Sequence, residues 1–225
     1  MGEYDVTSGL LVDHGATSDQ SAPGDNTGNF RDVVATGRGG DANVYIADES
    51  GHVFYSFDNG DTWDSVTPGS GSTIPALDFY DDTDGHAADT NQSAFETHDG
   101  ETWATIGIED RDENFYGVDS NGDDNVWICG GDGKVFEYDG GWQAETLGDL
   151  RLRDIEVATD RTSGLTVGAG GRVFRLSGAW TEEDTPTDDH LHGVVRSSPD
   201  ALDPSLVASD APDIAVGAGG TAIER

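Results

Sequence analysis

Short stretches of alternating hydrophobic and polar residues recur along the whole chain, with turns rich in Gly, Asp and Ser between them. Two examples are GHVFYSF at 51–57 and GKVFEYD at 133–139. In an extended strand successive side chains point to opposite faces, so this alternation is typical of strands that bury only one face. The pattern predicts an all-β protein.

Four tryptophans show that these stretches belong to a repeat. Trp63, Trp103, Trp142 and Trp180 are separated by 40, 39 and 38 residues, and short runs such as TWDSV and TWATI begin beside them. A fixed period of about 40 residues is typical of the blades of a β-propeller.

Each repeat unit supplies candidates for up to four strands. The expected innermost strands are FRDVVA, IPALDF, FYGVDS, LRDIEV and LHGVVR, and the second strands are NVYIAD, HAAD, NVWICG, LTVGAG and IAVGAG. The third strands are GHVFYSF, QSAFETH, GKVFEYD, GRVFRLS and GTAIER, and four tryptophans mark the fourth strands. We therefore expect one domain, 1–225, a five-bladed β-propeller with four-stranded antiparallel blades at about 30–66, 74–107, 114–146, 151–183 and 190–225.

The last unit lacks a fourth strand, because the sequence stops at Arg225 directly after its third strand. An unpaired strand edge is a liability that propellers remove by closing the ring. The N-terminal stretch GEYDVTSGLLV is extended in character and belongs to no unit. We expect a strand within residues 3–12 to close the last blade.

A second motif lies in the turn before the fourth strand. The first blade carries SFDNGDTW and the second carries THDGETW, and the same place is degraded to EYDGGW and RLSGAW in the next two. The residues that match the motif are Ser56, Asp58, Gly60 and Trp63 in the first blade and Thr97, Asp99, Gly100 and Trp103 in the second.

This motif resembles the Asp-box of BNR repeat proteins, and the wider unit is similar to photosystem II assembly factor-like propellers. The resemblance covers nearly the whole chain and implies the propeller fold. It also implies a structural role for the box, in which Asp58 caps its own turn, Gly60 takes a positive φ and Trp63 packs between blades. We expect neither Asp58 nor Asp99 to be catalytic.

The net charge of the chain limits the classes of molecule that it is expected to bind. There are 45 acidic residues against 11 basic ones, for a formal net charge of -34, and Lys134 is the single lysine. Such a surface is typical of a halophile's protein, and it repels nucleic acid and anionic membranes, whose binding depends on Lys and Arg. We expect neither nucleic acid binding nor membrane insertion.

The remaining composition points to a cytoplasmic setting at high salt. The single cysteine, Cys129, lies in an apolar run and is expected to be buried, which leaves no disulfide framework. No stretch approaches the roughly 18 apolar residues of a membrane span, and no signal peptide is visible at the N-terminus.

Aligning the five innermost strands gives a candidate binding site. Their second positions lie at one height around the axis and hold Arg31, Pro75, Tyr116, Arg153 and His192, with Arg151 nearby. Arginines converging in so acidic a chain favour a site for an anionic ligand or acidic peptide, with the tyrosine stacking or hydrogen-bonding. The alternative is that each arginine pairs with the aspartate beside it, Asp32 or Asp154.

Catalytic and metal sites are less well supported. A sialidase would need an arginine triad with a tyrosine nucleophile, which is not recognisable, although Asp32 and Asp154 at equivalent positions keep a glycosidase open. Asp119, Asn121 and Asp123 resemble a calcium loop with a misplaced glycine, and His190 with His192 has no third ligand. The glycine-rich VGAGG runs recur as turns between second and third strands, so no nucleotide site is expected. We predict no metal and no cofactor.

These observations together predict a non-enzymatic propeller that acts in protein interaction or assembly. Its protein partner is expected to bind near the channel mouth, and a small anionic ligand is the other occupant considered. The alternative is a glycan-binding or glycoside hydrolase-like propeller, which should show carboxylates of raised pKa in a deep pocket.

Overall fold

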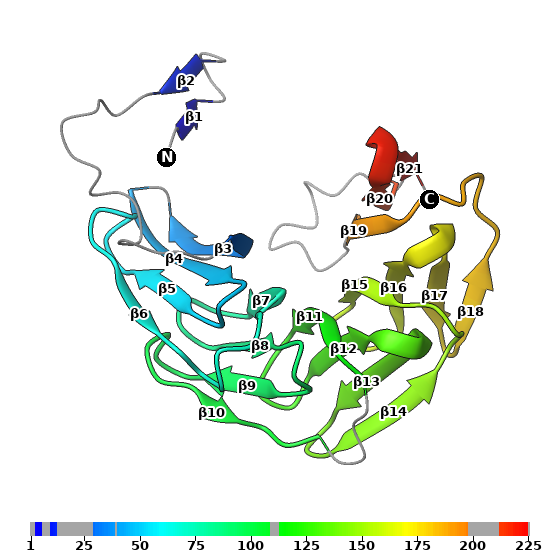
Figure 1. Ribbon diagram of the computed structural model, residues 1–225, viewed down its shortest axis with the longest axis horizontal. Helices are drawn as coiled ribbons and strands as arrows, with labels where there is room; N and C mark the ends of the chain where they lie inside the picture. The colour runs from blue at the N-terminus through cyan, green and yellow to red at the C-terminus, as the bar shows by residue number, and fades with distance from the viewer. Residues whose placement is uncertain are drawn as a thin grey trace.

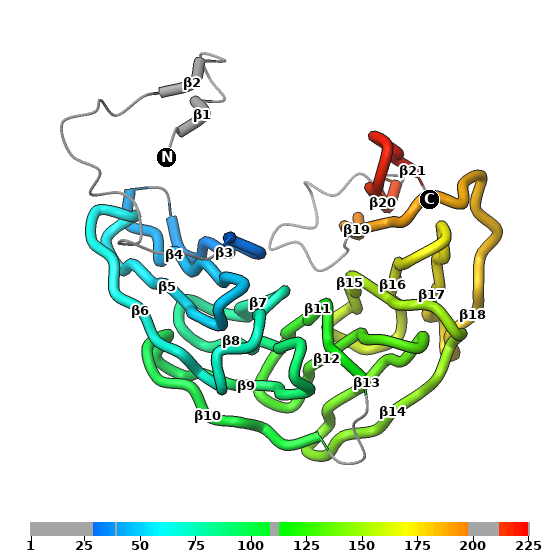
Figure 2. The backbone as a smooth tube through the Cα atoms, in the orientation of Figure 1, coloured from blue at the N-terminus to red at the C-terminus, as the bar shows by residue number. Residues whose placement is uncertain are grey.

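The computed structural model describes residues 3–5, 10–12, 29–38, 40–108, 113–197 and 212–224. Nearly all regular structure in these residues is β-strand, and five small antiparallel sheets follow one another around a common axis. Figure 1 looks along this axis, and Figure 2 traces the same path of the backbone. The protein is a five-bladed β-propeller, as the repeat predicted.

The strands occur where the repeat places them. The innermost are β3 (Phe30–Arg38), β7 (Ala76–Phe79), β11 (Phe115–Ser120), β15 (Leu152–Val157) and β19 (Leu191–Val195). The second are β4 (Asp41–Asp48), β8 (Gly85–Ala88), β12 (Val126–Gly130), β16 (Ser163–Gly168) and β20 (Ile214–Gly217). The third are β5 (Val53–Ser56), β9 (Ala94–Thr97), β13 (Lys134–Tyr138), β17 (Val173–Ser177) and β21 (Ala222–Glu224). The outermost are β6 (Asp64–Val66), β10 (Ala104–Thr105), β14 (Trp142–Thr146) and β18 (Trp180–Glu183).

The glycine-rich runs form the predicted turns between second and third strands. Each holds a short 3-10 turn, η1 (Gly131–Gly133), η2 (Ala169–Gly171) or η3 (Ala218–Gly220). In η2 the backbone takes positive φ at Gly170 and Gly171, and a Cβ on Gly171 would lie 1.9 Å from the carbonyl oxygen of Thr187. Only glycine fits there.

The last blade differs from the expectation in one respect. Its described sheet has three strands in the order β19-β20-β21, while β1 (Glu3–Asp5) pairs with β2 (Leu10–Val12) rather than with β21. A hairpin between two neighbouring segments closes a short loop, which costs less entropy than joining the two ends of a long chain. The expected pairing of the N-terminal strand with the last blade is therefore not found among the described strands.

The hydrophobic core lies between blades rather than within them. The four buried clusters in the described residues each join one blade to the next along the chain. Tyr45 of the first blade stacks on Phe79 of the second at 3.9 Å between ring centroids. Trp103 and Trp142 pack at the edges of two of these clusters, as their place in the repeat suggested.

No helix in the described part of the chain has both the length and the apolar character needed to cross a membrane.

Candidate functional site

The innermost strands share a local irregularity that decides where the candidate residues lie. In β3, β11, β15 and β19 the pairing with the second strand skips one residue, which forms a β-bulge. A bulge leaves one residue unpaired and changes the direction of its side chain relative to the normal alternation. The skipped residues are Arg31, Tyr116, Arg153 and His192.

The bulges bring two blades into contact through an arginine and a tyrosine. Arg151 immediately precedes β15, and its guanidinium carbon lies 4.4 Å from the centre of the Tyr116 ring on β11. A guanidinium over an aromatic face is attracted by the ring quadrupole. Arg151 is exposed, and no carboxylate pairs with it among the described residues.

Arg153 extends this contact to the last blade. Its Nη1 lies 3.4 Å from Nδ1 of His192 on β19, and its buried Nε has no hydrogen-bond partner among the described residues. Burial and the neighbouring Arg151 lower the pKa of Arg153. Burial and Arg153 likewise lower the pKa of His192, which favours a neutral ring whose Nδ1 accepts from the guanidinium.

Four of the five predicted ligand-binding residues therefore form one group, which we call the cationic cluster: Arg151, Arg153, Tyr116 and His192. Arg31 differs, because its Nη2 pairs with Oε2 of Glu49 at 3.0 Å within its own blade. Asn29 Nδ2 donates to the same oxygen at 2.9 Å. The remaining innermost strand, β7, has no such bulge, because its aligned residue, Pro75, precedes the start of the strand.

A set of carboxylates on the innermost strands, of which Asp119 is buried and Asp32, Asp78 and Asp154 are half-buried, joins neighbouring blades. Asp32 accepts a hydrogen bond from the backbone N–H of Leu77 at 2.9 Å, and Asp154 accepts one from Val194 at 2.7 Å. Asp78 and Asp119 lie two positions further along their innermost strands. Asp78 accepts a hydrogen bond from the backbone N–H of Ser120 at 2.8 Å, and Asp119 accepts one from that of Val157 at 3.1 Å, in each case from the next blade. We call these four residues the carboxylate braces.

The hydrogen bonds of the braces exclude the alternative that Arg31 and Arg153 pair with the adjacent aspartates. Asp32 also accepts from the N–H of Val33, and Asp154 from that of Ile155, so both carboxylates are occupied by backbone donors. In the described contacts the arginines have other partners, Glu49 and His192. Sequence analysis missed the braces, although aspartates at recurring positions of the innermost strands were a visible signal.

Burial raises the pKa of every brace, and backbone N–H donors oppose the rise. The pKa reaches about 6 at Asp78, about 8 at Asp119 and about 7 at Asp154. Glu156 lies two residues beyond Asp154 on β15, and burial followed by repulsion from Asp154 raises its pKa to about 7. Carboxylates with shifted pKa values are common in the active sites of hydrolases, but here the brace oxygens accept hydrogen bonds that hold neighbouring blades together.

The residues that match the Asp-box motif form turns held by their own hydrogen bonds. Asp58 accepts from Ser56 Oγ at 2.7 Å and from the N–H of Thr62 at 2.8 Å, and Trp63 Nε1 donates to the carbonyl oxygen of Gly60 at 3.0 Å. Hydrogen bonds from Thr62, first from its Oγ1 and then from its N–H, and from Ser56 Oγ lower the pKa of Asp58 to about 2. The second turn repeats the contacts with Thr97, Asp99 and Gly100, whereas Trp103 Nε1 is buried without a hydrogen-bond partner among the described residues.

The histidines and acidic turns considered as metal ligands are engaged elsewhere. His190 Nδ1 accepts from the N–H of Gly170 at 3.0 Å, and Asn121 Nδ2 donates to Asp119 at 2.6 Å. Tyr80 Oη contacts Asp123 across a blade boundary. Within the residues that the structure describes, no three His, Cys, Asp or Glu side chains are grouped so as to hold a metal ion.

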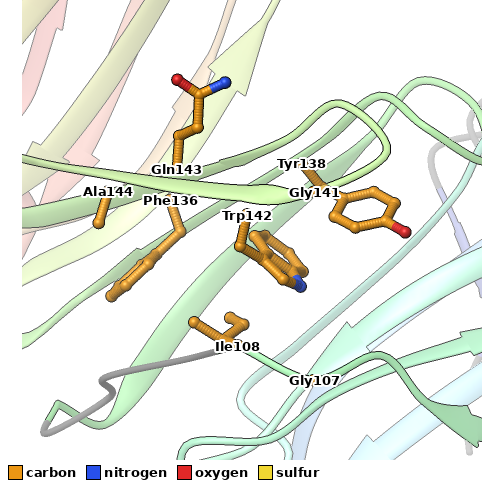
Figure 3. Close-up of a pocket in the computed structure, with 8 residues that line it drawn as sticks. All are labelled: Gly107, Ile108, Phe136, Tyr138, Gly141, Trp142, Gln143 and Ala144. Atoms are coloured by element: carbon orange, nitrogen blue, oxygen red, sulfur yellow. The ribbon is translucent and has the colours of Figure 1, made fainter.

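A separate cavity of about 390 Å³ lies at the outer part of the molecule, shown in Figure 3. It is built from β13 and β14 rather than from innermost strands, and its wall includes Phe136, Tyr138 and Trp142 facing Ile108. Trp142 Nε1 is buried without a hydrogen-bond partner in the described residues. The cavity contains none of the residues predicted as ligand-binding.

The fold and the cationic cluster define a class, a five-bladed propeller with basic and aromatic side chains at one end of its innermost strands. No family model matches the chain, and no curated protein matches it in sequence. Among solved structures it is similar to one described as YCF48 bound to D1 peptide, with 14% identity and a TM-score of 0.65. That match covers 89% of this chain and 64% of the other.

A second solved structure, described as U3-55K, is similar with 10% identity and a TM-score of 0.61, over 75% of this chain and 55% of that one. The chain thus spans less than two thirds of either neighbour. At these identities the likeness is one of fold.

Proposed function

We propose that this propeller is a non-enzymatic module that binds a protein partner, through an acidic peptide segment held at the cationic cluster. The observation that carries the proposal is that Arg151 and Arg153 have no carboxylate partner in the described residues, although the chain holds 45 acidic residues. Arg161, Arg172 and Arg175 each pair with carboxylates. Cations left without a counter-ion in so acidic a chain are suited to an external anion.

The chemistry of the cluster fits a peptide carboxylate. A guanidinium offers donors in a planar fork, and that of Arg151 belongs to an exposed residue. The Tyr116 ring positions the guanidinium of Arg151, and Nη1 of Arg153 donates to Nδ1 of His192. The structural neighbour whose description names a bound peptide supports the same kind of partner.

The setting we propose is a salt-rich cytosol of a halophile, where screening allows an acidic peptide to approach an acidic propeller. At molar salt the Debye length falls to about 3 Å, so long-range repulsion is removed while direct contacts persist. The net charge of -34 makes nucleic acid an unsuitable partner.

Peptide binding in molar KCl tests the proposal. A fluorescein-labelled hexaglutamate peptide should bind the protein, and Arg151→Gln with Arg153→Gln together should weaken binding at least about tenfold, because each charge-assisted hydrogen bond contributes roughly 1.5–3 kcal/mol. The matched control is Arg172→Gln, which removes the same charge from an arginine paired with Glu182. Equal affinity of the double variant and the control would exclude the cluster as the site.

The raised pKa values of these carboxylates allow a test of the alternative function, a glycoside hydrolase. Because the braces are committed to backbone donors, we favour binding over hydrolysis. Turnover of chromogenic glycosides at high salt that disappears in Glu156→Gln would contradict the non-enzymatic assignment.

A further inference from the structure

The outermost strand of the third blade, β14, has an open outer edge. It is the longest of the described outermost strands, with five residues against three, two and four in β6, β10 and β18. In the described sheets β14 pairs with β13 on its inner side and with no strand on its outer side, and Figure 1 draws it at the periphery of the molecule. Such an edge is a template for another strand, because its backbone N–H and C=O groups are unpaired.

The pairing with β13 decides which backbone groups of β14 face outward. The N–H of Leu147 donates to the carbonyl oxygen of Gly133 at 2.8 Å, so these two opposed residues form a hydrogen-bonded pair. Bonded and non-bonded pairs alternate in an antiparallel ladder, so Glu145 and Gln143 are the residues of β14 that bond to β13. The alternate residues direct their N–H and C=O groups away from β13: Trp142, Ala144 and Thr146.

A cavity lies on each face of the third blade beside this edge, and the first cavity is uncharged. Figure 3 shows Gln143 on the opposite side of β14 from Trp142 and Ala144. The cavity of about 390 Å³ lies on the Trp142 side and reaches Gly107 and Ile108, which follow β10 of the second blade. None of the residues that line it is charged, although 25% of the residues of the chain are. This cavity favours an apolar side chain.

The cavity on the other face is acidic. It has a volume of about 320 Å³ and lies between β14 and β18 of the fourth blade, and its charged side chains are Glu137, Glu145 and Arg161. Arg161 is already paired, with Asp139 at 2.8 Å and with Glu137 at 3.5 Å. Glu145 is exposed, and no described cation pairs with it. This cavity therefore favours a basic side chain.

A strand added to β14 would reach both cavities. Successive side chains of a strand point to opposite faces, so a peptide paired with this edge directs alternate residues toward the uncharged cavity and the acidic one. Backbone hydrogen bonds then supply affinity, and the two cavities supply specificity. A second copy of β14 fits less well, because it would bring the same unpaired glutamate against an acidic face.

We propose that the outer edge of β14 binds an extended segment of a partner protein as a fifth strand of the third blade. Apolar side chains of the segment enter the uncharged cavity, and basic side chains alternate with them in the acidic cavity. The cationic cluster lies on innermost strands of other blades and at the start of β11, so this inference does not depend on the proposed function.

Hydrogen exchange of backbone amides tests the added strand directly. In molar KCl with the peptide Lys-Val-Lys-Val-Lys-Val, NMR should show the amides of Ala144 and Thr146 exchanging at least about tenfold more slowly, because their N–H groups gain acceptors. The amide of Gln143, which already bonds to β13, should change little. The matched control peptide has the same composition in blocks, Lys-Lys-Lys-Val-Val-Val, and should give no such protection because it cannot alternate.

Variants separate the backbone contribution from that of the side chains. Ala144→Pro removes an outward N–H without breaking a bond to β13, and it should weaken binding of the alternating peptide at least about fivefold. Ala144→Ser keeps that N–H and should bind like the unchanged protein. Glu145→Gln should weaken the Lys-Val peptide about threefold and leave Thr-Val-Thr-Val-Thr-Val unaffected. Asp64→Asn on β6 removes an equal charge far from this edge and should change neither affinity.

Three results would overturn the proposal. The first is the absence of protection at Ala144 and Thr146 with millimolar alternating peptide, and the second is equal protection by the alternating and block peptides. The third is protection that grows with protein concentration when no peptide is present, which would assign the edge to a second copy of the chain.

Discussion

The pKa values of single aspartates shift in opposite directions in this protein, and the degree of burial decides the direction. Exposed Asp58 and Asp99 accept several local donors, and their pKa values fall to about 2. Asp119, which is buried, and Asp154, which is half-buried, also accept hydrogen bonds from backbone donors, but desolvation outweighs these bonds and raises the pKa. Desolvation of the charged form is the larger effect once a carboxylate leaves water.

The raised pKa values of three carboxyl groups predict that the stability of the folded state decreases as pH rises above neutrality. Asp119, Asp154 and Glu156, with pKa values of about 8, 7 and 7, hold protons that the unfolded chain has already released near pH 4. The folded state therefore binds more protons, and its stability falls as pH rises through these values. Above about pH 6.5 the buried His86, whose pKa burial lowers to about 4, no longer opposes this trend.

Thermal unfolding at pH 6.5 and 8.5 in molar KCl checks this prediction. The Tm should fall by several degrees, because about 1 kcal/mol corresponds to roughly 2–4 °C in a domain of this size. Glu156→Gln should narrow the difference, whereas Glu145→Gln on the exposed strand β14 should leave it unchanged. A Tm that rises over this interval would be inconsistent with the buried carboxylates.

At the scale of elements, the unit of stability is the boundary between two blades. Each sheet alone is too small to bury its faces, and the hydrophobic clusters form only when one blade lies against the next. The innermost strands contribute most directly, since they carry both the buried apolar positions and the braces. Their bulges add a third role by changing the direction of the Arg153 and His192 side chains.

A core truncation at one boundary should therefore destabilise the whole domain. Ile155 on β15 is 1% exposed and packs against the third blade, so Ile155→Ala should cost about 2–5 kcal/mol. Leu150→Ala, at a site 38% exposed just before the same strand, should change the free energy of unfolding by less than about 0.5 kcal/mol. Equal losses in urea denaturation would show that the boundary is not the stabilising unit.

At the scale of the whole molecule, charge opposes the compact state. A net charge of -34 on 225 residues repels itself, and only 11 basic residues are available to compensate. Several of these are placed against carboxylates, as Arg175 is against Glu183 and Asp213. The remaining repulsion is long-range and is therefore sensitive to ionic strength.

Salt should accordingly stabilise the fold. The Tm should be markedly higher in 2 M KCl than in 0.1 M KCl, since the Debye length falls from about 10 Å towards 3 Å. Sucrose at equal osmolality separates charge screening from general exclusion effects and should raise the Tm much less. An unchanged Tm between the two salt concentrations would refute a dominant role for self-repulsion.

The sequence by itself determined the number of blades and the order of strands. These follow from a repeat of about 40 residues whose local pattern is read strand by strand, so no long-range information was needed. The alignment of second positions grouped Tyr116, Arg153 and His192, with Arg151 nearby, but it also included Arg31 and Pro75.

Only the tertiary structure decided how these residues are used. The bulges, the pairing of Arg31 with Glu49, and the commitment of Asp32 and Asp154 to the next blade depend on contacts between residues about 20 to 45 positions apart. The pairing of β1 with β2 and the exposure of Val33 likewise reflect which segments meet in space. Local alternation encodes which face a side chain takes, whereas its partner is set by the packing of whole blades.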